Sequence, residues 1–171
     1  TVRASVPNYL ISKYIKKYET TCDAKVIFNG DGSDEVSGGY MYFHAAPNPT
    51  DFDLDCRRLL NEIHFFDVLR SDRSVSSDWG LEARTPFLDK EFVKFYMTID
   101  PKLKMYSDDR IEKYLLRKAF EDTNIIPNDV LWRPKEAFSD GCSSENRSWH
   151  KIIQEYINTI ITDKEFNENK D

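Results

Sequence analysis

One short β-rich run, residues 25–28, constrains the fold more than any other feature, because it is the only convincing strand in the sequence. It leads directly into an acidic, glycine-rich loop at residues 29–35 (N-G-D-G-S-D-E), and a helix is predicted to follow through Tyr40 to Phe43. A lone strand leaves its backbone hydrogen bonds unpaired and needs neighbours in a sheet. We therefore expect the other strands of this sheet to be supplied from upstream of the chain.

The rest of the chain carries apolar residues at helical spacing. These patterns predict helices over residues 2–18, 51–73, 90–98, 111–121, 128–132 and 149–161. The segments that lack such spacing and are predicted to be loops are residues 74–86 and 132–141. The expected structure is mostly helical, with one short strand of a parallel sheet.

Charge and cysteine content exclude several classes of protein. The chain has 24 basic and 30 acidic residues and a net charge of −6, which argues against binding to nucleic acid or to an anionic membrane. No apolar run approaches the roughly 20 residues of a membrane helix, and no signal-peptide pattern is present. Cys22, Cys56 and Cys142 lie far apart, so each is predicted to be a small apolar residue rather than part of a disulfide or zinc site. We expect a soluble, cytoplasmic protein.

The loop at residues 29–35 is the first candidate site. Four of the six glycines fall within ten residues at this point, and such a loop lets a ligand approach bare backbone amides. Asp31, Asp34 and Glu35 would repel bare phosphate, so the pattern favours a metal–phosphate, ammonia or amine site over a phosphate loop. A solvated acidic turn remains the alternative on this pattern alone.

Two further segments carry charges in positions of interest. Asp67 and Arg70 lie three residues apart on a predicted helix, where a surface ion pair is the simplest interpretation. Lys135 lies among aromatic residues and a proline in a predicted loop, and a restrained lysine is a compact charge that can follow a phosphate during a reaction. Each pattern by itself is ambiguous.

Taken together, five segments in this order resemble the synthetase domain of glutamine-hydrolysing asparagine synthetases, and the eukaryotic type more than the bacterial one. They are V-R-A-S (2–5), N-G-D-G-S-D-E (29–35), F-D-V-L-R-S-D-R (66–73), G-L-E-A-R-T-P-F-L-D (80–89) and W-R-P-K-E-A-F-S-D-G (132–141). The resemblance implies an α/β fold of the adenine-nucleotide α-hydrolase type. It also implies that residues 1–171 are part of this domain and lack the upstream pyrophosphate loop, the N-terminal glutaminase domain and the C-terminal end.

The resemblance implies an ATP-dependent ligase reaction. ATP adenylates the side-chain carboxylate of aspartate and releases pyrophosphate, and ammonia from glutamine then converts β-aspartyl-AMP to asparagine and AMP. The implied cofactors are ATP and Mg²⁺, and the implied partners are aspartate and a glutaminase domain of the parent chain. The oligomeric state is left open, a homodimer included. Because the pyrophosphate loop S-G-G-x-D-S is absent from these residues, we expect the isolated chain to be inactive.

The resemblance also assigns roles to individual residues. The implied catalytic residues are Asp31, Lys135, Asp67 and Arg70. The implied nucleotide-binding residues are Asn29, Gly30, Gly32, Asp34 and Glu35. Lys135 would stabilise the adenylation transition state, Asp31 would organise the protons of the attacking ammonia, and Asp34 would be the metal ligand.

The loop departs from the family pattern S-G-E-G-S-D-E at two positions. Asn29 replaces the serine and Asp31 replaces the glutamate. The missing methylene withdraws the carboxylate by about an ångström, and a misplacement of that size can cost ~10²-fold in rate. Either the backbone compensates or the activity is reduced, so a catalytically decayed nucleotide-binding or interaction protein is the alternative function. The β-lactam-forming relatives, which share less of residues 132–141, are a weaker match.

Overall fold

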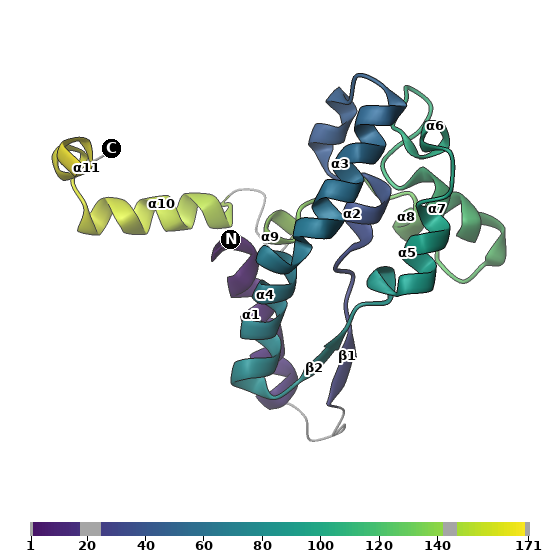
Figure 1. Cartoon of the computed structure of the whole chain (residues 1–171). Coiled ribbons are helices and arrows are strands. Elements are labelled where there is room, and N and C mark those ends of the chain that lie inside the picture. The colour runs from purple at the N-terminus through teal and green to yellow at the C-terminus, as the bar shows by residue number, and fades with distance from the viewer. Residues whose placement is uncertain (1, 18–24, 142–146, 170–171) are drawn as a thin grey trace.

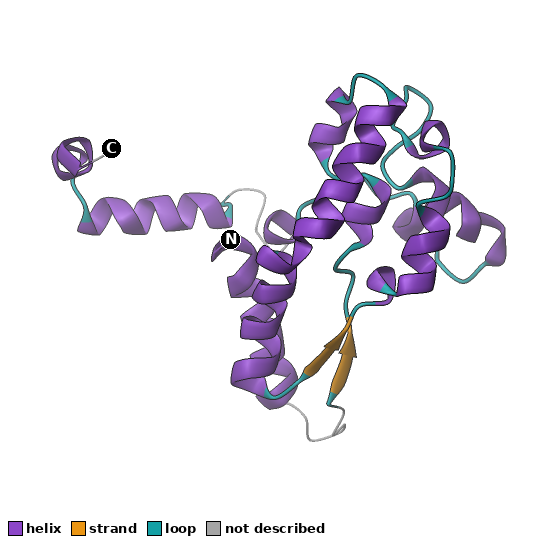
Figure 2. Cartoon of the chain, viewed as in Figure 1, coloured by secondary structure: helices purple, strands orange, loops and turns teal. Residues whose placement is uncertain are grey.

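A computed structural model describes residues 2–17, 25–141 and 147–169. In these ranges, strands β1 (Val26–Phe28) and β2 (Glu82–Arg84) form a parallel two-stranded sheet in which Val26 pairs with Glu82 and Phe28 with Arg84 (Figure 2). The ladder extends by one bond beyond each end of the register. Asn29 N donates to Arg84 O at 2.9 Å, and Glu82 N donates to Lys25 O at 2.7 Å.

The prediction of a single strand was therefore wrong. β2 lies within residues 74–86, which were predicted to be a loop, and its sequence Glu-Ala-Arg lacks β-branched residues. Pairing with β1 determines its conformation, because a strand's propensity depends strongly on its neighbours in the sheet. Phe28 on β1 remains 77% exposed. The expectation of further strands from upstream stays a prediction.

The segment between the two strands is the helical crossover that a parallel pair requires. It contains α2 (Ser33–Ser37), the 3₁₀ helix η2 (Met41–Ala45) and α3 (Pro49–Glu62), followed by the 3₁₀ helix η3 (Ile63–Phe65), α4 (Asp67–Ser71) and the π-helix η4 (Asp72–Ser77). The predicted continuous helix over 51–73 is thus broken. The backbone of Phe66, with φ −128° and ψ −61°, leaves helical geometry at the break.

This break has a direct consequence for the candidate site. Because Phe66 leaves helical geometry, α4 begins anew at Asp67 and carries Arg70 three residues later. α4 and η4 lie alongside α1 (Val2–Lys17), which confirms the predicted first helix over its described residues (Figure 1).

A small apolar core packs η2 against α3, and α2 also contacts α3. The core is formed by Phe43, Phe52, Cys56 and Leu59. The buried Cys56 behaves as the predicted apolar residue, and burial raises the pKa of its thiol to about 12. Cys22 and Cys142 lie outside the described residues. Since α2 follows directly on the loop at residues 29–32, its contact with α3 helps to position the loop.

Three of the next helices follow the sequence patterns with shorter bounds. They are α5 (Lys90–Tyr96), α7 (Tyr114–Phe120) and α8 (Asn128–Leu131). The helices that were not predicted are the 3₁₀ helix η5 (Pro86–Leu88), α6 (Pro101–Lys104), the 3₁₀ helix η6 (Glu121–Thr123) and α9 (Phe138–Gly141). α9 corrects the prediction of a loop over 132–141, since four of those residues form a turn of helix that contacts α1. The predicted helix over 111–121 starts only at Tyr114.

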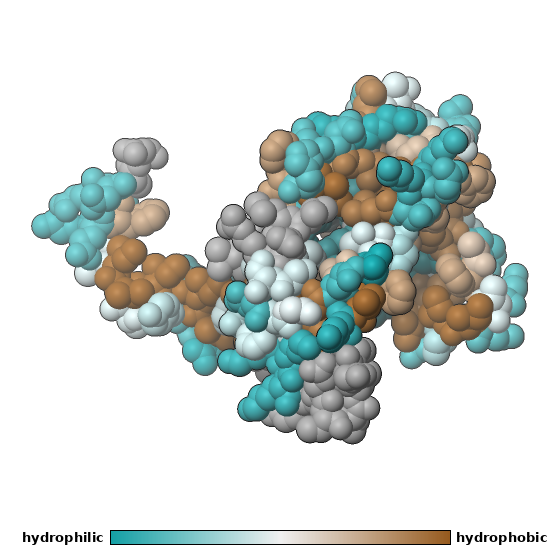
Figure 3. All heavy atoms as spheres, turned by 60° about the horizontal axis from the view of Figure 1, so that its bottom comes forward, coloured by the Kyte–Doolittle hydropathy of each residue, from teal (hydrophilic) through white to brown (hydrophobic). Residues whose placement is uncertain are grey.

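Helices α10 (Trp149–Ile160) and α11 (Asp163–Asn169) form an arm that projects from the rest of the chain (Figure 1). The amphipathic pattern predicted for 149–161 is confirmed, but its apolar residues, among them Tyr156, Ile157 and Ile160, are exposed (Figure 3). No helix among the described residues is long and apolar enough to cross a membrane.

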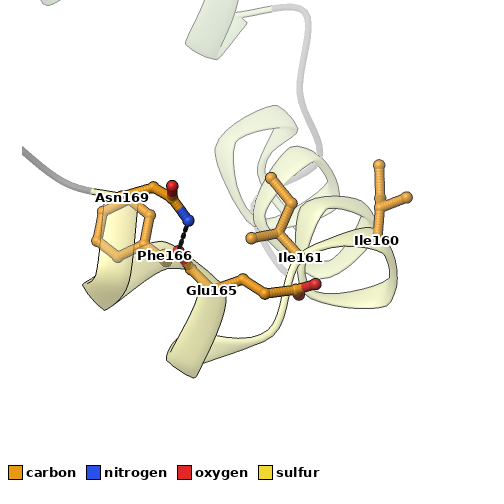
Figure 4. A pocket seen from close by; sticks show the side chains of 5 residues that line it. All are labelled: Ile160, Ile161, Glu165, Phe166 and Asn169. Carbon is orange, nitrogen blue, oxygen red and sulfur yellow. Dashed lines mark hydrogen bonds between the residues drawn. The ribbon is translucent and has the colours of Figure 1, made fainter.

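A pocket of about 370 Å³ lies between the two helices of this arm. Its lining residues are Ile160, Ile161, Glu165, Phe166 and Asn169 (Figure 4). The Asn169 side chain donates to the backbone oxygen of Glu165 at 2.8 Å. The arm lies away from α2 in Figure 1, so this pocket is separate from the glycine-rich loop and its acidic residues.

Candidate functional site

The candidate site lies where the loop at residues 29–32, the start of α2, helix α4 and the segment after α8 converge. Asp31 and Asp34 come from the loop and α2, and Asp67 and Arg70 come from α4. Lys135 reaches Asp34 across a sequence separation of 101 residues. All five of these predicted residues take part in two adjoining networks of hydrogen bonds and ion pairs.

The first network surrounds the Asp31 carboxylate. Asn29 Nδ2 donates to Asp31 Oδ2 at 3.0 Å, and Ser71 Oγ donates to the same oxygen at 2.5 Å. The Asp31 backbone N–H donates in return to Asn29 Oδ1 at 3.2 Å. The two residues that depart from the family pattern are therefore hydrogen-bonded to each other. Asn29, from the same loop, holds the carboxylate of the shorter Asp31 side chain in place.

Arg70 joins this carboxylate to a second one. Its Nη1 lies 2.6 Å from Asp67 Oδ1, and its Nη2 lies 3.5 Å from Asp31 Oδ1. The side chains of Arg70 and Asp67 are only 16% and 10% exposed, so the interpretation as a surface ion pair is wrong. Arg70 Nε is buried and has no hydrogen-bond partner among the described residues. The guanidinium is thus held between two carboxylates, and its Nε donor is left unused.

A buried acidic pair lies behind Arg70. Glu35 is 1% exposed, accepts a hydrogen bond from the Tyr40 hydroxyl and shares a side-chain hydrogen bond with Asp67. Burial raises the pKa of Glu35 to about 7, and Asp67 acts in the same direction, whereas the Tyr40 hydroxyl opposes the shift. Glu35 therefore keeps its proton at pH values where an exposed glutamate is ionised. The implied nucleotide-binding role of Glu35 stays a prediction.

The proton on Glu35 makes stability depend on pH. Between about pH 4.5 and pH 7 the folded chain holds a proton that the unfolded chain releases, so this group's contribution to stability is complete below the window and is lost as the pH rises. We expect Glu35→Gln to remove this decrease. Urea unfolding at several pH values measures it, with the exposed Glu168 changed to Gln as the control. Equal pH slopes for Glu35→Gln and the unmodified protein would contradict the assignment.

The second network surrounds the Asp34 carboxylate. Lys135 Nζ lies 2.9 Å from Oδ1 and 2.8 Å from Oδ2, and Lys113 Nζ lies 2.9 Å from Oδ1. Burial would raise the pKa of Asp34, but the two ammonium groups outweigh it and hold that pKa below its usual value. Lys135 Nζ also lies 5.8 Å from the centre of the Tyr40 ring. Lys113 and Tyr40 were not predicted as site residues, because neither lies in a segment that resembles the family.

The residues present do not form a metal cage of their own. Within the described ranges, no group of three or more His, Cys, Asp or Glu residues could hold a metal ion. Both oxygens of Asp34 already accept from lysines. Mg²⁺ bound to a nucleotide needs only one or two protein carboxylates. The implied role of Asp34 as its ligand therefore stays a prediction.

The loop glycines serve different purposes. Gly32 has φ 90°, and a Cβ at this position would lie 2.3 Å from Leu88 Cδ2, so the fold itself requires glycine there. A Cβ at Gly30 would meet nothing within 4 Å. Because nothing lies close to Gly30, its backbone is accessible. The predicted contact with a nucleotide therefore fits Gly30 better than Gly32, which packs against Leu88.

Comparisons with known proteins agree with the resemblance. The family described as Asparagine synthase matches residues 1–55 and 46–170. Asparagine synthetase (glutamine-hydrolyzing) from Homo sapiens is 52% identical over 163 residues, which are 95% of this chain. The enzymes of the same name from Cricetulus griseus and Gallus gallus are 51% and 50% identical over 96% and 95% of it. The chain spans 28% of the length of each of these relatives.

Proposed function

Because the chain belongs to the asparagine synthase family, we propose that the protein carrying it makes asparagine from aspartate, ATP and ammonia. The relatives are named glutamine-hydrolysing asparagine synthetases, so a glutaminase domain elsewhere in the protein is the proposed source of ammonia. The observation that carries the proposal is the contact of Lys135 Nζ with both oxygens of Asp34. Asp34 lies two residues after the end of the open loop at residues 29–32. Lys135 provides a half-buried cation beside a backbone that a nucleotide can approach.

In the proposed first step, an oxygen of the aspartate side-chain carboxylate attacks the α-phosphorus of ATP and the bond to the pyrophosphate oxygen breaks. Negative charge gathers on the leaving pyrophosphate. Lys135 stabilises this charge by exchanging the Asp34 carboxylate for a phosphate oxygen. The ammonium group is held by hydrogen bonds to Asp34, and a phosphate oxygen can accept the same hydrogen bonds.

In the proposed second step, ammonia attacks the carbonyl carbon of β-aspartyl-AMP, and AMP leaves with the bonding electrons. The attacking nitrogen must lose a proton, and Asp31 is the proposed acceptor. Its orientation by Asn29 and Ser71 supports that role. Arg70, which lies between Asp31 and Asp67, is proposed to position the negatively charged substrate.

The products test this proposal. The full-length protein, supplied with aspartate, ATP and ammonium, is expected to form asparagine, AMP and pyrophosphate in equal amounts. Formation of ADP and phosphate would indicate a different ligase chemistry. ATP binding without any product would favour the alternative of a catalytically decayed nucleotide-binding protein.

The contact between Asn29 and Asp31 predicts that these residues are coupled. Asn29→Ser and Asp31→Glu, introduced singly, are each expected to slow asparagine formation. Asn29→Ser removes the amide that donates to the carboxylate, and Asp31→Glu moves the carboxylate away from that amide. The double variant restores the family pattern. Its rate of asparagine formation is expected to exceed the rate calculated by multiplying the two single effects by about 2-fold to 100-fold, the range of coupling between contacting residues. Steady-state rates of the four proteins measure this. Purely additive effects would show that the pair does not compensate.

Several further features belong to the proposal. Mg²⁺ is proposed to accompany ATP, with Asp34 as the facing carboxylate. A cytoplasmic location remains a prediction from the sequence, and the oligomeric state stays open, a homodimer included. A size measurement of the purified full-length protein checks the oligomeric state.

A further inference from the structure

Lys113 occupies a central place in the site although no sequence motif includes it. Its Nζ donates to Ser33 Oγ at 2.9 Å and lies 2.9 Å from Asp34 Oδ1. It comes from the residue directly before α7, 80 positions after Ser33. The ammonium group of Lys113 therefore contacts the same carboxylate that holds Lys135.

Two local features of the backbone make this contact possible. Lys113 has φ 61°, a left-handed conformation that residues with side chains rarely adopt. Gly39 leaves the space that the pair fills, because a Cβ there would lie 2.2 Å from Asp34 Oδ1 and 2.6 Å from Lys113 Cε. An uncommon backbone conformation and a glycine from a different segment thus meet at one ion pair.

We propose that Lys113 is a positioning residue that shares the Asp34 carboxylate with Lys135 and so allows Lys135 to move to the phosphates of the nucleotide. This inference rests on the proposed function. Lys113 neither replaces Lys135 nor contacts the reacting atoms. It remains on Asp34 when Lys135 leaves.

The electrostatic reason is the cost of a buried, unpaired charge. If Lys135 were the only cation on Asp34, its departure would leave a largely buried carboxylate without a partner, which is strongly unfavourable. With Lys113 in place, the carboxylate keeps one charge-assisted hydrogen bond throughout. The two ammonium groups also repel each other, which weakens the hold of Asp34 on Lys135.

A neutral side chain of similar length tests the role. In the full-length protein, Lys113→Met is expected to lower kcat for aspartate-dependent exchange of pyrophosphate into ATP by about 10-fold to 100-fold, the usual cost of losing a supporting contact. The KM for aspartate is expected to stay within about 3-fold, because substrate binding does not involve this lysine. Lys113→Arg, which keeps the charge and the donors, is expected to retain most of kcat.

The matched control is Lys118→Met on the following turns of α7. Lys118 is 52% exposed and pairs with Glu121, three residues later in the chain. It lies outside both networks, so its loss should leave kcat and KM unchanged. Circular dichroism and the melting temperature of each variant report whether it folds. A folded Lys113→Met protein with unchanged kcat would overturn the proposal.

A second comparison separates positioning from a general structural role. In the Asp34→Asn background, a neutral amide no longer traps Lys135, so adding Lys113→Met is expected to have little further effect on kcat. A full additional loss, or a Lys113→Arg protein as impaired as Lys113→Met, would also overturn the proposal. If the unmodified protein shows no exchange at all, the proposed function fails and this inference fails with it. Exchange in the unmodified protein with an unaffected Lys113→Met variant overturns the inference alone.

Discussion

Lys135→Ala is expected to reduce aspartate-dependent exchange of pyrophosphate into ATP by at least about 10²-fold to 10³-fold, the cost of removing one donor that stabilises transition-state charge. Lys135 is the side chain that can transfer from Asp34 to the leaving pyrophosphate, and alanine supplies no charge to take its place. The fold should be retained, because Lys113 still pairs with Asp34.

The matched control for this change is Lys94→Ala on α5, an exposed lysine outside both networks. Its exchange rate is expected to equal that of the unmodified protein. Melting temperatures of both variants establish that they are folded. Near-normal exchange by the Lys135→Ala protein would show that Lys135 takes no part in the adenylation step. Its contact with Asp34 would then be structural only.

Gly38→Ala is expected to destabilise the chain by about 2–5 kcal/mol, from about 1–2 kcal/mol of left-handed backbone strain plus about 1–3 kcal/mol of overpacking. Gly38 has φ 64°, and a Cβ there would lie 2.3 Å from Phe52 Cζ. Phe52 is a fully buried member of the apolar core between η2 and α3, and Gly38 directly follows α2. The same substitution should therefore disturb the position of the loop that precedes α2.

Gly80→Ala separates the two contributions. Gly80 has a similar φ of 61°, but a Cβ there would meet nothing within 4 Å. Its substitution should cost only the backbone strain of about 1–2 kcal/mol. Urea unfolding of both variants measures the difference. Equal destabilisation by the two changes would show that the contact with Phe52 relaxes without cost.

The two strands illustrate what sequence patterns can and cannot predict in this chain. β1 consists of Val, Ile and Phe, whose strand preference is visible locally, and it was predicted. β2 consists of Glu, Ala and Arg, which have no such preference, and only its pairing with β1 makes it a strand. The helix break at Phe66 is a similar case, because no Gly or Pro interrupts residues 51–73.

The site divides in the same way. Asp31, Asp34, Asp67, Arg70 and Lys135 could all be predicted, because each lies in a segment that resembles the family. Their contacts could not, since the partners lie 39 residues apart for Arg70 with Asp31 and 101 apart for Lys135 with Asp34. Lys113 has no such signal, because it lies outside these segments, in a run of charged residues that is ordinary on a protein surface. Only the folded chain places it on Asp34.

The transfer of an oxygen atom tests the proposed activity most directly. Aspartate labelled with ¹⁸O in its side-chain carboxylate is supplied with ATP and ammonium to the full-length protein, and the nucleotide product is analysed by mass spectrometry. If the carboxylate attacks the α-phosphorus, one ¹⁸O atom passes to AMP when ammonia displaces it, and AMP is expected to carry the label. Unlabelled AMP, or label found only in inorganic phosphate, would contradict adenylation of aspartate.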